Sequence, residues 1–446
     1  MSEPDLPAEP EQPAETEPAP PAAGRWDRVR VDLHSQGLVL AHLVRWIALG
    51  SVVGVLAGLS SAGFLVTLDW VTDIRLTHPW LLWLLPVAGF GIGLVYHYVG
   101  GDAVAGNNLI IDEIHEPRAW IPRRMAPLVY LGTEVTQLFG GSVGREGTAL
   151  QMSGSLTDWF SRLVSLKPSD RRIMLIAALA GGFGAVFGVP VAGFVFALEV
   201  QSIGRMRYDA LVPAVSASLV GDMIVRGLGV HHAALPKLTG IDLTVGLVAK
   251  IALAGLAFGL IARVFSAVTH AIQHAHVTAS VWPPLRPFFG GIGVIALTYL
   301  VGNRDYNGLS LGLIEASLAG GAGVVAFAFA WKLIFTSVTL GSGFQGGEVT
   351  PLFVIGATLG VTLGRLVGVD PQIMAAVGMV AVFAGAANVP IACTVMGAEL
   401  FGADGFVLFA VGCVVSYVFS SHRGIYHSQR VDTPKAAHLG GDGVAG

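Results

Sequence analysis

Apolar segments fill nearly the whole chain, and this feature constrains the fold more than any other. Of the 446 residues, 53% are hydrophobic and only 13% are charged, whereas a soluble globular protein carries about 25% charged residues. Most of the surface must therefore face something other than water. We expect an all-α polytopic protein of the cell membrane, because helices satisfy their own backbone hydrogen bonds in lipid.

The apolar segments differ strongly in length. Those long enough to cross a hydrocarbon core of ~30 Å include 38–70, 80–99, 211–228, 243–272, 322–340 and 350–367. Shorter ones, broken by Gly or Pro, are 126–139, 173–187, 190–203, 372–386 and 390–401. Helices that stop at membrane depth are tolerated only where their ends are buried or line a cavity. Such half-helices, converging on a central site, are typical of transporters.

The two ends of the chain differ in composition from its apolar middle. The first 24 residues hold six acidic side chains, several prolines and no Lys or Arg, so they cannot bury apolar surface. We expect a disordered tail over residues 1–30, a membrane domain over 31–430 and a short polar tail over 431–446.

Charges and cysteines exclude several classes of protein. Arg25, Arg28 and Arg30 precede the first apolar segment, which favours a cytoplasmic N-terminus. Nothing in the charge pattern indicates nucleic-acid binding. Cys393 and Cys413 both lie in apolar runs, so neither a disulfide framework nor a metal quartet is expected. We expect no cofactor and no bound metal.

An internal repeat divides the membrane domain into two homologous halves. Residues 189–199 read VPVAGFVFALE and residues 389–399 read VPIACTVMGAE. A Gly/Ala-rich run precedes each, and a loop that begins Gly-Ser lies further upstream, GSVGREGT in one half and GSGFQGGEVTP in the other. Three features in the same order predict repeats over about 38–228 and 243–430.

The loop Gly144-Arg145-Glu146-Gly147-Thr148 is the most informative motif. A charge facing the membrane interior is costly unless it is paired or reaches a water-filled cavity. Glu146 lies at the expected start of a helix, where free N–H groups attract anions. Either its carboxylate or a transported anion can fill that position, and Gly144 and Gly147 let either approach the backbone. The alternative is that Glu146 only caps its helix.

The second-half loop, GGEVTP, also precedes a long apolar segment. Pro351 suits the first turn of a helix, where its missing N–H costs nothing. Thr350 offers a hydroxyl, and both Val349 and Thr350 offer backbone N–H groups beside Gly347. These groups are candidate anion ligands.

Two further segments carry weaker candidates. Ala105-Gly106-Asn107 opens a short apolar segment, and the amide of Asn107 either donates to an anion or caps a helix. Tyr426 places a phenol after the last apolar segment.

Two sets of charged residues have alternative interpretations. The acidic and histidine residues of segment 112–116 (DEIHE) could bind a metal, but their spacing matches no zinc-enzyme motif, and a solvated loop is favoured. Glu199 and Glu399 lie deep in the two repeats, where structural hydrogen bonding is favoured over a functional role.

Together these motifs resemble the CLC family of chloride channels and proton-coupled anion exchangers, over nearly all of residues 38–430. GREGT is similar to the family's G-(K/R)-E-G-P loop, which implies that Glu146 is the gating and proton-coupling glutamate. GGEVTP resembles its G-x-F-x-P loop. Ala105-Gly106-Asn107-Asn108 falls where the family has G-S-G-x-P, and Tyr426 where it has its central tyrosine. The resemblance implies inverted repeats of tilted, broken helices and a homodimer with one pore per subunit.

Departures from the family pattern bear on selectivity. Ala105 replaces the serine of the chloride type, and Val200 replaces the inner proton-relay glutamate. Val349 and Thr350 stand in place of Phe and Ala. Together with Asn107 and the missing inner glutamate, they are similar to the fluoride-exporting branch, which usually has Met where Ala105 stands.

We therefore expect transport of a halide, chloride or fluoride, across the bilayer by a proton-coupled antiporter. A passive channel on the same scaffold remains the alternative. A membrane enzyme would need a nucleophile or metal motif that the sequence lacks, and a purely structural protein would not need paired Gly-rich loops. The expected partners are a halide, protons, lipid and a second copy of the chain.

Overall fold

The computed structural model describes residues 25–435, with side chains from Gln36 onward. The chain divides after Arg45, and the described residues 46–435 form a packed body. It is built almost entirely of helices, with two strands of two residues each. This confirms the predicted all-α fold.

The first half contains α1 (Arg25–Thr77), α2 (Leu85–Val95), α3 (Asn107–His115), α4 (Met125–Leu138), α5 (Glu146–Leu163), α6 (Pro168–Phe187), α7 (Pro190–Glu199) and α8 (Leu211–Gly227). Short helical turns between them are η1 (Pro79–Leu84), η2 (Tyr96–Gly100), η3 (Gly101–Ala105) and η4 (Tyr208–Ala210), and strand β1 is Ser202–Ile203.

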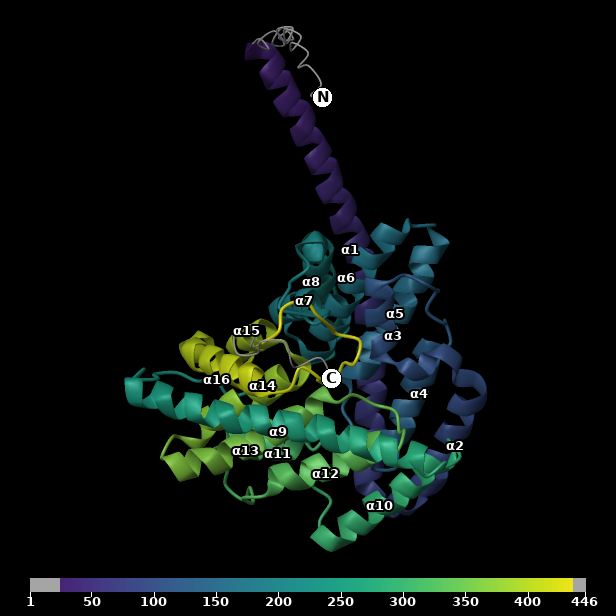
Figure 1. The fold of residues 1–446 in the computed structure, drawn as a ribbon, viewed down its shortest axis with the longest axis vertical. Helices are drawn as coiled ribbons and strands as arrows, with labels where there is room; N and C mark the ends of the chain where they lie inside the picture. Colours follow the sequence, from purple (N-terminus) through teal and green to yellow (C-terminus); the bar gives the residue numbers. More distant parts are fainter. Residues whose placement is uncertain (1–24, 436–446) are drawn as a thin grey trace, which may run out of the picture. The chain divides into compact units, whose positions relative to one another are not determined.

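The second half contains α9 (Val245–Thr278), α10 (Leu285–Val301), α11 (Leu311–Leu318), α12 (Ala328–Gly341), α13 (Val349–Val367), α14 (Pro371–Ala387), α15 (Pro390–Phe401), the turn η5 (Ala403–Gly405), α16 (Phe406–Phe419) and strand β2 (Arg430–Val431). In Figure 1, α9, α13 and α14 lie next to one another, and contacts join each pair of these helices.

Within the described residues, the helical stretches long and apolar enough to cross a membrane are Gln36–Thr77, Pro79–His115, Tyr208–Gly227, Val245–Thr278 and Val349–Val367. The prediction of a full-length span over 322–340 is wrong. Helix α12 begins only at Ala328 and has 14 residues, because Gly320, Gly321 and Gly323 adopt left-handed backbone conformations upstream of it. Helices α10 and α16, which have 17 and 14 residues, lie outside the apolar segments named from the sequence.

The repeated sequence produces a repeated local structure. Helix α6 ends at Gly188 and α14 ends at Asn388, both in the left-handed conformation with φ of 69° and 59°. Gly and Asn adopt this conformation more readily than other residues, which makes them helix terminators. Pro190 and Pro390 then begin α7 and α15, since proline is favoured in the first helical turn.

The two inverted halves pack against each other through α7 and α15 and through α2 and α10. Strands β1 and β2 pair in parallel, with Ser202 opposite Arg430, and join the end of α7 to the segment after α16. This pairing and a hydrogen bond from Lys435 Nζ to the carbonyl of Tyr417 (2.8 Å) place residues 431–435 in the packed body.

The predicted N-terminal tail lies mostly outside the described residues. Its last part, residues 25–30, belongs to α1.

Candidate functional site

The two Gly-rich loops meet at the boundary between the halves. Gly144 N donates to the carbonyl of Gly347 at 2.6 Å, and Gly347 N donates to the carbonyl of Gly144 at 2.9 Å. The two residues thus form an antiparallel bridge. Helix α5 starts two residues after Gly144 and α13 starts two residues after Gly347. The bridge therefore holds the N-termini of two half-helices together.

Glycine is required at this junction because the loops approach so closely. A Cβ on Gly347 would lie 2.8 Å from the backbone nitrogen of Gly147, which is closer than real Cβ contacts allow. A Cβ on Gly147 would lie 3.1 Å from Asn107 Nδ2 and from the Cα of Gly347. The beginning of α3 therefore joins the two loops, and three of the segments selected from the sequence converge.

The carboxylate of Glu146 is fully buried at this junction. It accepts a hydrogen bond from the backbone N–H of Thr350 at 3.1 Å and another from the Thr350 hydroxyl. It also accepts from the N–H of Arg145 at 3.2 Å. Thr350 lies in the first turn of α13, so the carboxylate occupies the N-terminus of a helix from the other half. Glu146 therefore binds mainly to α13, and it does not act only as a cap of its own helix, α5.

A cavity of about 310 Å³ reaches Thr350 from one side. Arg145, Asp69 and Glu315 line it together with Phe353. The buried Nε of Arg145 has no hydrogen-bond partner. A positive charge beside Thr350 favours an anion that approaches the N-terminus of α13 through this cavity.

A second cavity of about 700 Å³ reaches the other side of the second-half loop. Gly346 and Glu348 line it, and it shares no lining residue with the first cavity. Among the described residues, the carboxylate of Glu348 has no hydrogen-bond or ion-pair partner. The sequence interpretation gave this residue no role, although an acid inside a Gly-rich loop at membrane depth was a usable signal.

The remaining residues predicted for the site differ in their burial and in their position within the helices. Asn107 is the first residue of α3, Gly106 is its N-cap, and no side chain caps the helix. The alternative that Asn107 is an N-cap is therefore wrong. Its buried Oδ1 has no partner, and its amide lies against Gly147. Ala105 is exposed at the end of η3, and Val349 is buried as the first residue of α13.

Tyr426 is buried, with 4% of its surface exposed. Asn108 fixes the segment that carries it, because Asn108 Oδ1 accepts from the N–H of Ser428 at 3.1 Å. The sequence interpretation did not select Asn108, since a contact over 320 residues leaves no local signal.

Phenylalanines from both halves gather beside this tyrosine. The ring of Phe196 lies 6.4 Å from that of Tyr426. Phe183 and Phe383, at equivalent positions of the two repeats, are nearly parallel with centroids 6.1 Å apart. Phe353 of α13 meets Phe383 edge-on at 5.7 Å. These rings form an apolar wall next to the polar loops.

Glu199 and Glu399 make the structural hydrogen bonds that the sequence favoured. Glu199, at the end of α7, accepts from the N–H groups of Ile391 and Ala392 at 3.0 and 2.8 Å. Glu399 of α15 accepts from those of Val191 and Ala192 at 2.9 and 2.6 Å. Each thus caps the helix that carries the other.

The charged segment 112–116 lies at the end of α3 rather than in a solvated loop, and three of its side chains have protein partners. Glu113 pairs with Arg171 at 2.8 Å, Glu116 pairs with Arg430, and His115 Nε2 lies 2.8 Å from the carbonyl oxygen of Gln201. No group of three metal-binding side chains converges within residues 25–435.

Inverted repeats of broken helices, with two N-termini facing a buried carboxylate between two cavities, define an integral membrane anion transport protein. The family model described as "Voltage gated chloride channel" matches residues 88–421. The chain belongs to this family, the CLC channels and anion exchangers.

Relatives and solved structures agree with this assignment. The chain is 46% identical over 401 residues, 89% of each chain, to a "Chloride/fluoride channel protein" of Pseudomonas syringae pv. tomato. It is 27% identical over 382 residues, 79% of each chain, to the "H(+)/Cl(-) exchange transporter ClcA" of Yersinia pestis. It also resembles a solved "CLC-type fluoride/proton antiporter", with a TM-score of 0.84 and 32% identity, over 87% of this chain and 98% of that one.

Proposed function

We propose that the chain exchanges fluoride for protons and that Glu146 links the two ions. The observation that carries this proposal is the position of the Glu146 carboxylate on the N–H and hydroxyl of Thr350. A helix N-terminus attracts an anion of either kind. A halide that binds there must displace the carboxylate, and the displaced carboxylate can then take up a proton.

The donors around this position suit a small, strongly hydrated halide. Fluoride must exchange its water for short and numerous hydrogen bonds. The Thr350 hydroxyl, the Thr350 N–H and the amide of Asn107 beside Gly147 are such donors. Ala105 adds none. The similarity to a solved fluoride/proton antiporter supports the same choice, and the relative from Pseudomonas syringae is named for both chloride and fluoride.

We further infer that Glu348 carries the proton between Glu146 and the second cavity. Val200 is apolar and buried, so it cannot serve as the inner relay. Glu348 adjoins the loop bridge and borders a cavity that does not share residues with the one that reaches Thr350. Separate routes let a proton and a halide reach Glu146 without meeting.

The purified full-length protein in liposomes tests the proposed function. Fluoride efflux down its gradient should drive proton uptake, and fluoride should move at least about tenfold faster than chloride, which corresponds to ~1.4 kcal/mol. Rapid chloride transport with fluoride excluded would assign the chain to the chloride exchangers. Fluoride flux without proton movement would favour the passive channel.

We also infer that two copies associate through α8, α15 and α16. These helices form a continuous group with α7 and expose large apolar side chains, namely Leu219, Met223, Ile391, Val414 and Val418. A second copy would cover this face, whereas transport would persist because each subunit holds a complete loop pair.

Mass photometry of the protein in nanodiscs tests this association. Met223→Trp with Val414→Trp should lower the dimer fraction, while Leu253→Trp on the exposed face of α9 should not. A monomeric wild-type protein would contradict the inferred dimer. In that case lipid, and not a second copy, would cover the exposed face of α8, α15 and α16.

A further inference from the structure

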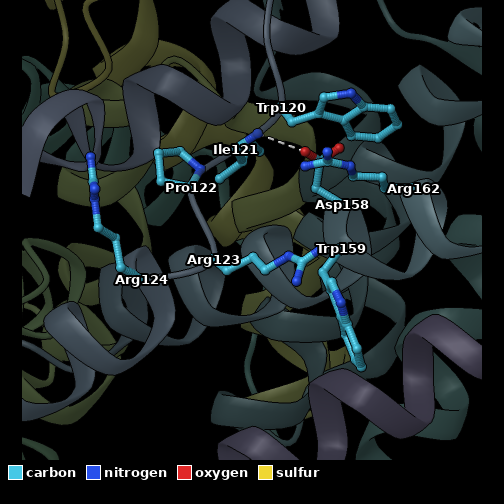
Figure 2. A pocket seen from close by; sticks show the side chains of 8 residues that line it. All are labelled: Trp120, Ile121, Pro122, Arg123, Arg124, Asp158, Trp159 and Arg162. Carbon is cyan, nitrogen blue, oxygen red and sulfur yellow. Dashed lines mark hydrogen bonds between the residues drawn. The ribbon is translucent and has the colours of Figure 1, made fainter.

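A second polar pocket lies away from the loop bridge, between the segment 116–124 and the end of α5. Its volume is about 380 Å³, and its walls include Trp120, Pro122, Arg123, Asp158, Trp159 and Arg162 (Figure 2). We propose that it binds the phosphate-bearing head group of an anionic phospholipid from the adjacent leaflet.

Buried ionic contacts hold this pocket in shape. Arg171 pairs with Asp158 at 2.5 Å and with Glu113 at 2.8 Å, and it donates to the carbonyl of Ala119 at 2.8 Å. Asp158 also accepts from the N–H of Ile121 at 2.7 Å, as Figure 2 shows. These contacts fix the loop and compensate the charge of Asp158. The acid is therefore not available to neutralise the other arginines.

Two arginines of the pocket lack an anionic partner. Arg123 and Arg162 are exposed, and within the part of the chain that the structure describes neither guanidinium group forms a hydrogen bond or an ion pair. The guanidinium of Arg162 lies 5.8 Å from the ring centroid of Trp120, and that of Arg171 lies 4.7 Å from it. Arg124 also lines the pocket, but its side chain extends in a different direction from that of Arg123 (Figure 2). Two guanidinium groups beside a rigid wall suit the paired oxygens of a phosphate.

The tryptophans favour a lipid over a soluble phosphate. Trp120 and Trp159 are 41% and 39% exposed, although tryptophan is among the most deeply buried residue types on average. Tryptophan side chains of this kind anchor proteins at the level of the lipid head groups. Basic pockets between membrane helices on the cytoplasmic side bind anionic head groups.

The position of Trp46 assigns the pocket to one face. Trp46 begins the packed body and belongs to a buried cluster with Met174, against which Phe160 packs. Phe160 adjoins Trp159 in α5. The cytoplasmic N-terminus expected from the arginines before the first apolar segment places this end in the inner leaflet.

Native mass spectrometry of the full-length protein tests the proposal, with phosphatidylglycerol and phosphatidylcholine as probes. The wild type should retain phosphatidylglycerol preferentially. Arg123→Gln combined with Arg162→Gln should weaken retention at least about tenfold, because two charge-assisted hydrogen-bonding groups are lost. Should the double variant fold poorly, Arg162→Gln alone should weaken retention about threefold.

The matched control is Arg118→Gln. Arg118 lies in the same loop and its side chain is 80% exposed, but it does not line the pocket, so retention should stay within about twofold of wild type. Equal loss in this control, unchanged retention in the double variant or equal retention of phosphatidylcholine would each overturn the proposal. Displacement of the lipid by equimolar glycerol phosphate would instead assign the pocket to soluble phosphates and overturn the lipid assignment.

Discussion

Buried glutamates bind helix N-termini across the two halves in two different ways. Glu199 and Glu399 form a reciprocal pair, in which each accepts two backbone N–H groups at 2.6–3.0 Å. Glu146 accepts one backbone N–H of α13, at 3.1 Å, and a hydroxyl. Glu348, in the second-half loop, makes no equivalent contact with the N-terminus of α5. Its carboxylate has no partner among the described residues.

The difference separates a structural contact from an exchangeable one. The reciprocal pair fastens α7 to α15, and each carboxylate is the only side-chain partner described for the N–H groups it caps. The N-terminus under Glu146 borders a cavity with Arg145 in its wall, so water or a halide can replace the carboxylate. The two Gly-rich loops thus differ in their contacts, unlike the reciprocal pair of glutamates. As a result, the N-terminus of α13 can bind either the Glu146 carboxylate or a halide.

Stability measurements should separate the two types of glutamate most clearly. Glu199→Ala or Glu399→Ala leaves two buried N–H groups unpaired and should lower the free energy of unfolding by about 3 kcal/mol. Glu146→Ala should lower it by less than about 1 kcal/mol, because water or a halide can reach Thr350. Unfolding titrations in mild detergent measure both, and an equal loss at the two positions would refute the distinction.

The role of the unpartnered Glu348 can be tested separately. Glu348→Gln removes a titratable group but keeps the size of the side chain. Fluoride-driven proton uptake should fall at least about tenfold, in line with the contribution of one proton-transfer group. Glu315→Gln, in the wall of the other cavity, is the matched control and should retain coupling. Normal proton uptake in Glu348→Gln would remove this residue from the proton route.

The hydroxyl of Thr350 should matter for selectivity. Thr350→Ala removes one donor worth about 1.5–3 kcal/mol to a charged group, so fluoride efflux should fall about tenfold and chloride efflux less. Thr350→Ser keeps the hydroxyl and should retain most of the fluoride flux. If alanine reduces both fluxes equally, Thr350 belongs to the site but does not set its selectivity.

The smallest effect is expected at Tyr426. Its phenol supplements the helix terminus as a single further hydrogen-bond donor, so Tyr426→Phe should reduce fluoride efflux only about threefold and relax selectivity. Complete loss of flux in a well-folded Tyr426→Phe protein would show that the phenol contributes more to anion binding than the helix N-terminus does.

The sequence predicted the repeats, the loop pair and the structural glutamates because each leaves a local pattern. Pro190 and Pro390, for example, mark equivalent helix starts. It could not predict that Glu146 binds Thr350 rather than its own helix, since the partner lies 204 positions away. The shortened α12 was missed because apolar residues flank Gly320 and Gly323, and hydrophobicity alone does not reveal their left-handed backbone.

The central claim is that a halide and the Glu146 carboxylate compete for one helix N-terminus. Fluoride efflux and proton uptake measured together in liposomes, for wild type and Glu146→Gln, test this claim most directly. The wild type should couple the two fluxes, and Glu146→Gln should fold normally but lose halide-driven proton uptake, since an amide cannot carry a proton. Undiminished proton pumping in Glu146→Gln would contradict the account.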